Sequence, residues 1–166
     1  DCRLLSPRFL AECADRLGRD QSLGLIQPRI TDPDRPGDEP RRWIPRLRKG
    51  DPGTSSEIFS VLEAAVVLPR AVFVRAGGWP SEFFYAHEGI ELCWRVWEAG
   101  YVPWYAGNIV VHHPVIDPQR HEEFWRLNAR NRVLLARRNL PVPLRPLYAG
   151  SWALITTARV RDREAR

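Results

Sequence analysis

The stretch that decides how the centre of this chain folds reads Phe83-Phe84-Tyr85-Ala86-His87-Glu88-Gly89-Ile90-Glu91-Leu92-Cys93-Trp94-Arg95. A loop here runs into a helix that we expect over 89–99 and that Gly100 ends. Glu88 and Glu91 lie three residues apart at this transition. Carboxylates that converge with a histidine can hold a metal ion or move a proton, and little else in the sequence can do either.

Helices and strands are expected on both sides of this stretch. The predicted helices cover 7–17, 69–76 and 119–139, and the predicted strands cover 23–27, 61–68, 101–105 and 108–112. The run 61–68 is nearly all apolar, so we expect a strand that is buried on both faces. Between residues 31 and 56 few residues are apolar, which predicts a long mobile loop.

Composition excludes several classes of protein. The chain has 166 residues, enough for one domain with a core, and no apolar run long enough for an obvious membrane span. Its 3 cysteines form no CxxC pair, which argues against a disulfide scaffold or a structural zinc site. The net charge of +5 is carried by arginine, since Lys49 is the only lysine, and this pattern often reflects a GC-rich genome. We therefore expect no nucleic-acid partner.

The candidate residues also have ordinary structural explanations. The helix dipole favours an acid such as Glu88 in the first turn. Glu91 can form an i,i+4 ion pair with Arg95 on an exposed helix face. His112 and His113 end a strand, where adjacent side chains point to opposite faces, so only one of them can face a given site. A lone histidine there is more often structural than functional.

Trp79 and His87 are the remaining candidates. Trp79 lies in a loop between two glycines and a proline, where it can stack on a sugar or nucleobase ring or pack beneath the loop. His87-Glu88 forms part of a zinc-hydrolase motif, but no His-Glu-x-x-His is complete, so a metal hydrolase is a distant alternative.

Taken in order, these pieces resemble the second half of the family 2 glycosyltransferases, which have the GT-A fold. The resemblance runs from Asp1 to about Pro141 and rests on motifs in a fixed order: Leu4–Pro7, Gly24–Pro28, Val61–Arg70, Gly77-Gly78-Trp79, Phe83-Phe84, Glu88–Arg95, Ala99-Gly100-Tyr101, Val110–His112 and Arg130-Asn131-Arg132. It implies an α/β fold with a partial GT-A-like mixed sheet flanked by helices. Residues 1–140 would be the acceptor half of that domain, lacking the N-terminal nucleotide-binding half, and 141–166 an apolar and basic extension.

The resemblance also implies an activity. Such enzymes transfer a sugar from a nucleotide-sugar donor to a hydroxyl acceptor with inversion, and we expect a glycan or lipid-linked acceptor in cell-envelope or polysaccharide synthesis. Asp1 aligns with the last acid of the family's Asp-x-Asp metal motif, so we expect Asp1 and His112 to hold Mg²⁺ or Mn²⁺. Residues 1–166 alone are expected to be inactive. We expect a cytoplasmic protein, peripheral at the inner face of the plasma membrane, where arginines of the last helix and tail would meet anionic lipid.

The resemblance leaves the catalytic base open. The family's usual Glu-Asp is Glu88-Gly89 here, so the acid usually assigned as base is missing. We expect Glu91 to be the base because it matches the second acid of the motif, with Glu88 as the second candidate. The residues expected to bind the acceptor are Trp79, His87 and Arg95. A different class stays open, because Gly89 also favours a non-catalytic or degenerate module that binds a glycan or a membrane surface.

Overall fold

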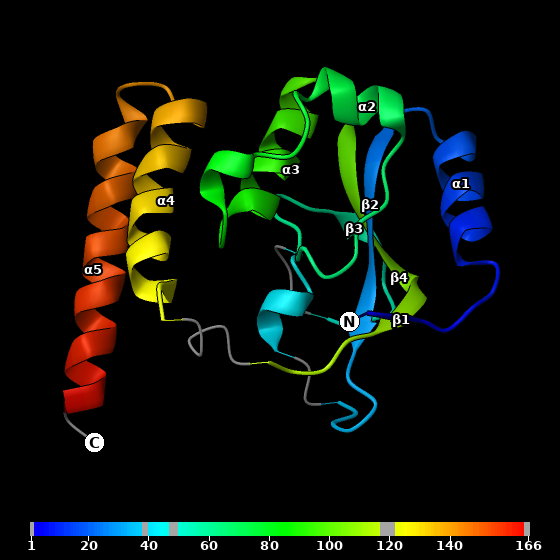
Figure 1. The fold of residues 1–166 in the computed structure, drawn as a ribbon, viewed down its shortest axis with the longest axis horizontal. Coiled ribbons are helices and arrows are strands. Elements are labelled where there is room, and N and C mark those ends of the chain that lie inside the picture. The colour runs from blue at the N-terminus through cyan, green and yellow to red at the C-terminus, as the bar shows by residue number, and fades with distance from the viewer. Residues whose placement is uncertain (1, 38–39, 47–49, 117–121, 165–166) are drawn as a thin grey trace.

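The computed structural model describes residues 2–37, 40–46, 50–116 and 122–164 (Figure 1). In chain order the elements are β1 (Arg3–Leu4), α1 (Phe9–Arg19), β2 (Leu23–Thr31), the short 3-10 helix η1 (Arg41–Trp43), β3 (Ser56–Glu57), α2 (Arg70–Arg75), the 3-10 helix η2 (Ser81–Phe83), α3 (Glu88–Glu98), β4 (Val102–His112), α4 (Phe124–Asn139) and α5 (Leu144–Glu164). The fold is mixed α/β, with a four-stranded mixed sheet flanked by helices.

The sheet is built around β4. β2 pairs with it in parallel, and β1 and β3 pair with it antiparallel. The register between β2 and β4 shifts after Pro28, beside Gly107. A Cβ at Gly107 would lie 2.4 Å from the carbonyl oxygen of Gly53, so only glycine fits beneath the loop that crosses there. This bulge lets the chain continue as one long strand, where the sequence predicted two strands over 101–105 and 108–112.

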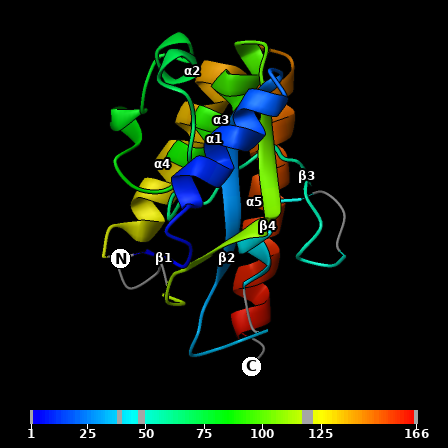
Figure 2. The same cartoon turned by 90° about the vertical axis from the view of Figure 1, so that its right-hand side faces the viewer.

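The two faces of the sheet carry separate parts of the core. α1 covers one face and α3 the other, with the α4–α5 hairpin beyond α3 (Figures 1 and 2). Alternation along the strands divides their side chains between the faces. Leu25 and Tyr105 pack with α3, while their neighbours Ile26 and Ala106 pack with α1.

The strand predicted over 61–68 is wrong. Only Val67 pairs with the sheet, through an isolated antiparallel bridge to Ile26 with N···O distances of 2.7 and 2.9 Å. The N–H of Leu62 donates instead to the side-chain oxygen of the buried Gln27, and the chain turns at residue 63. The run is apolar because its side chains pack against both parts of the core. Its hydrophobicity reports burial and not pairing.

The other elements agree more closely with the sequence. The helix predicted over 7–17 lies at Phe9–Arg19, and the apolar stretch 147–155 lies within α5. The helix expected from residue 119 begins at Phe124, and 117–121 are outside the described residues. In the predicted loop 31–56, Trp43 is 2% exposed, and its carbonyl accepts a 3.0 Å hydrogen bond from Gln27.

In the described part of the chain, no helix has both the length and the apolar character to cross a membrane.

Candidate functional site

A strained loop leads directly into α3. Phe84, Ala86 and His87 have φ of 61°, 68° and 75°, in the left-handed region that side chains other than glycine rarely adopt. Each such residue costs about 1–2 kcal/mol and persists only where the surroundings fix it. Three of them within four residues, immediately before Glu88, mark this corner as a candidate site.

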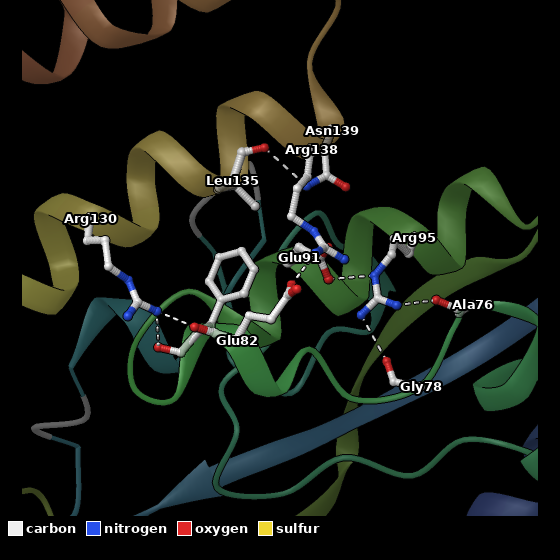
Figure 3. Close-up of polar contacts among 10 residues, drawn as sticks. Ala76, Gly78, Glu82, Glu91, Arg95, Arg130, Leu135, Arg138 and Asn139 are labelled. Carbon is white, nitrogen blue, oxygen red and sulfur yellow. Dashed lines mark hydrogen bonds and ion pairs between the residues drawn. The ribbon is translucent and has the colours of Figure 1, made fainter.

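Asn131 of α4 holds the loop in place. The side chain is fully buried, and its Nδ2 donates to the carbonyl oxygens of Phe83, Tyr85 and Ala86 at 2.8, 2.7 and 2.7 Å. The neighbouring Arg130 donates to the carbonyls on the N-terminal side of the loop (Figure 3). Sequence spacing could not identify this contact, because it joins segments about 45 residues apart.

Two carboxylates meet at the first turn of α3. Glu88 opens the helix, and Glu63 reaches it from the turn that interrupts the predicted strand. The backbone N–H of Gly89 donates to Glu63 Oε1 at 2.8 Å. Glu88 Oε2 is buried and has no hydrogen-bond partner among the residues that the structure describes. The site therefore holds two acids, of which the sequence singled out only Glu88.

Gly89 leaves no room for a side chain. A Cβ there would lie 2.6 Å from Glu63 Oε1 and 2.6 Å from the carbonyl oxygen of Val61. The space that a side chain at position 89 would enter is therefore filled by the segment 61–63, including a carboxylate. Glu63 is not among the residues predicted from the sequence, because the apolar run 61–68 predicts one buried strand. The available signal was a lone acid within an apolar run, which needs an exposed face or a partner.

The environment changes the proton affinity of these groups. Burial raises the pKa of Glu88. Desolvation by the surrounding protein atoms is the larger cause, and repulsion from Glu88 the smaller cause, that raise the pKa of Glu63 to about 7. Glu63 nevertheless keeps an exposed surface, and solvent there limits this effect of burial on the pKa. Burial, and then the charge of Arg132, lower the pKa of His87 to about 4, so His87 is neutral at pH 7.

Glu91 lies deeper than the sequence predicted. The ion pair expected with Arg95 is present, but the Glu91 side chain is 0% exposed. Its Oε2 accepts from Arg95 Nε, and its Oε1 accepts from Nε of Arg138 in α4 at 2.9 Å (Figure 3). Both carboxylate oxygens are thus held by guanidinium groups, and Glu91 ties α3 to α4.

Arg95 extends this network away from the site. It donates to the carbonyl oxygens of Ala76 and, at 2.8 Å, Gly78, which follow α2 (Figure 3). Its Nε, Nη1 and Nη2 are all bonded within the protein. Trp79, next in the chain, is 42% exposed and can meet a ligand.

His112 lies at the end of β4, opposite Arg3 of β1. It contributes to the lowered pKa of Asp32, whose main cause is a 2.7 Å hydrogen bond from the N–H of Val115. The second Asp32 oxygen accepts from Asp34 N–H, so both are occupied.

Asp1, the other expected metal ligand, is outside the described residues. Within 2–37, 40–46, 50–116 and 122–164, no three His, Cys, Asp or Glu side chains are grouped to hold a metal ion. The Mg²⁺ or Mn²⁺ site expected at Asp1 and His112 therefore stays a prediction.

The arrangement therefore offers proton chemistry at the start of α3. The exposed Glu63 lies beside the partly buried Glu88, next to the loop that α4 fixes. Comparison with known proteins adds no assignment, since neither models of protein families nor curated proteins give a match to this chain.

Proposed function

We propose that this chain is the acceptor half of a GT-A-like, family 2 glycosyltransferase that moves a sugar from a nucleotide-sugar to a hydroxyl of a glycan or lipid-linked acceptor, with inversion. The observation that carries the proposal is the carboxylate pair of Glu63 and Glu88 beside the strained loop. General-base catalysis needs a carboxylate within reach of the hydroxyl and with a pKa near the working pH. Strain held by a buried amide is the kind of feature that collects at functional sites.

The proton acceptor fits the start of α3 better than it fits Glu91. A base must have an oxygen that can approach the acceptor hydroxyl. Both oxygens of Glu91 are engaged by Arg95 and Arg138, and proton uptake would take the counter-charge from Arg95 and leave Arg138 with Glu82 alone. Glu91 then acts as a positioning residue that fixes α3 against α4, while an acid at the first turn of α3 meets the acceptor.

The remaining expected contacts fall into two groups. Trp79 is exposed and offers a flat apolar face for a sugar ring, and His87 adjoins Glu88 as a neutral hydrogen-bonding group. Arg95 donates to the carbonyl oxygens of Ala76 and Gly78, so we assign it a role in supporting the site and not in contacting the acceptor. A divalent ion held with Asp1 and His112 would neutralise the charge of the leaving diphosphate when bound. No step of the proposal depends on that ion.

A second candidate function is binding to an anionic membrane surface at the cytoplasmic face of the plasma membrane. α5 exposes large apolar side chains, namely Leu144, Leu147, Leu154 and Ile155 at 47%, 69%, 74% and 39%. Trp152 of the same helix packs on α4, with the guanidinium carbon of Arg132 3.5 Å from its ring centre. An apolar helix face beside arginines is typical of interfacial helices. Membrane binding without sugar transfer would favour the non-catalytic module.

The transferase proposal is tested with the protein at its full natural length. Release of nucleoside diphosphate is measured from a set of UDP-, GDP- and dTDP-hexoses, with and without glycan and lipid-linked acceptors. We expect turnover with at least one donor, and none from residues 1–166 alone. Absence of turnover from a folded full-length protein, together with binding to anionic vesicles, would transfer the assignment to the binding module.

A further inference from the structure

We propose that Glu63 is the catalytic base, accepting the proton of the acceptor hydroxyl; this inference rests on the proposed transferase function. Glu63 lies outside the motif that the sequence singled out. It reaches the first turn of α3 because the chain turns at residue 63 and does not continue as a strand. The 2.8 Å hydrogen bond from the N–H of Gly89 then fixes its carboxylate over the start of the helix.

The packing around Gly89 supports this placement. The point where a side chain at position 89 would begin lies 2.6 Å from Glu63 Oε1 and 2.9 Å from Glu63 Cδ. An acid from another segment therefore occupies the corner that an acid at 89 would occupy. The helix N-terminus carries partial positive charge, which stabilises a carboxylate there.

Exposure distinguishes Glu63 from Glu88. Glu63 keeps an exposed surface, whereas Glu88 Oε2 is enclosed, with no hydrogen-bond partner among the described residues. An acceptor hydroxyl that arrives from solvent can thus meet Glu63. Glu88 acts through its charge, because a neighbouring carboxylate increases the affinity of Glu63 for a proton. Glu88 is therefore a positioning residue that makes Glu63 a stronger base.

The step balances without any further reactant. The hydroxyl proton of the acceptor moves to the Glu63 carboxylate, and the oxygen lone pair forms the new bond to the anomeric carbon of the donor sugar. The bond from that carbon to the diphosphate oxygen breaks, and the nucleoside diphosphate leaves with the electron pair. Glu63 then releases its proton to solvent.

Glu63→Gln in the full-length protein is the central test, with the donor that gives the highest turnover. The amide oxygen can still accept from Gly89 N–H, so the fold is kept while the proton acceptor is lost. We expect kcat to fall about 10²–10⁴-fold with donor KM unchanged. Glu63→Asp, which keeps a carboxylate, should retain activity well above that of the glutamine variant. Glu57→Gln, the same change at an exposed site on β3, is the control and should leave kcat unchanged.

The pH profile adds a readout that a structural role would not change. The wild type should lose kcat/KM as pH falls, because Glu63 becomes protonated. Glu88→Gln removes the repelling charge and should shift this loss to lower pH. His87 is neutral across this range and Arg132 stays cationic, so neither titrates in its place.

The outcomes separate the base assignment from the function. Three results together support Glu63 as the catalytic base. Glu63→Gln loses activity, Glu63→Asp recovers part of it, and in Glu88→Gln the acidic side of the pH profile moves to lower pH. Near-normal kcat in Glu63→Gln overturns the assignment and leaves the transferase function standing. If the wild type turns over none of the donors, both proposals fall.

Discussion

Replacing Glu91 by glutamine tests whether this acid holds the fold or takes the proton. Glu91→Gln keeps the size of the side chain but removes the charge between Arg95 and Arg138. The new amide can accept from one guanidinium, while its NH₂ group faces the other donor. Removing one partner from a buried ion pair costs about 3–5 kcal/mol.

The exposure of the partners sets where in that range the loss falls. The side chains of Glu91 and Arg95 are 0% and 14% exposed, so Arg95 cannot easily turn to water. Arg138 is 36% exposed and can. We therefore expect a loss of about 3 kcal/mol. A unit of this size loses about 2–4 °C in Tm per kcal/mol, which predicts a decrease of about 6–12 °C.

Thermal unfolding of the full-length protein measures this loss, and kcat is measured at a temperature where the variant is folded. Glu98→Gln, an exposed change on the same helix, serves as control and should stay within about 0.5 kcal/mol of the wild type. A lower Tm with kcat retained supports the structural role. An unchanged Tm with kcat reduced about 10²–10⁴-fold would show that Glu91 is the base predicted from the sequence, and would refute the reasoning from its buried pair.

Four further predictions concern the loop, the first turn of α3, the pH range and α5. Asn131→Ala should lower stability by about 2–3 kcal/mol and speed amide hydrogen exchange in 83–87, because three loop carbonyls lose their donor. Gly89→Ala should destabilise by about 1–3 kcal/mol in urea unfolding, since its Cβ meets a backbone oxygen. Gly150→Ala, with nothing within 4 Å, should instead stabilise by about 0.5–1 kcal/mol. The pKa of Glu63 is raised from 4.5 to about 7 in the folded state, so its contribution to stability is present below pH 4.5 and lost as pH rises to 7. Glu63→Gln should therefore remove the decrease in Tm that Glu63 causes between pH 4.5 and 7. A curve of Tm against pH that is the same in this variant and in the wild type would contradict the raised pKa. Leu154→Glu should weaken co-sedimentation with anionic vesicles, because it places a charge on the exposed apolar face of α5. If the wild type binds neutral and anionic vesicles equally at all salt concentrations, charge attraction makes no contribution to membrane binding.

Local patterns predicted the elements that depend on neighbours in sequence. The helix expected over 89–99 is α3, and the strands expected over 23–27, 101–105 and 108–112 lie within the longer β2 and β4. The run 61–68 shows the limit, because hydrophobicity records that a segment is buried but does not say whether its backbone pairs. The Leu62 N–H donates to the side chain of Gln27, 35 residues away, and the spacing of apolar residues in the sequence does not predict such a contact.

The site was predictable only in part, for a related reason. Glu88 could be found because acids favour the start of a helix. Its neighbour Glu63 comes from a turn whose position depends on packing against both faces of the sheet. The left-handed residues of the loop carry no sequence signal, since none is glycine, and their conformation depends on Asn131 from a distant helix. Long-range contacts thus decide the features that give this corner its chemistry.

The contact between Gly89 and the segment 61–63 also restricts how this corner can change by mutation. A side chain at position 89 is costly while Glu63 and the Val61 carbonyl stand where they do. Loss of the acid at 63 meets no such steric barrier. A carboxylate would therefore move from position 63 to position 89 at the least steric cost if the acid at 63 were lost and the Val61 carbonyl displaced before a side chain was gained at 89. The effect of a substitution at either position thus depends on the residue at the other, and the reverse order of substitutions carries the larger steric cost.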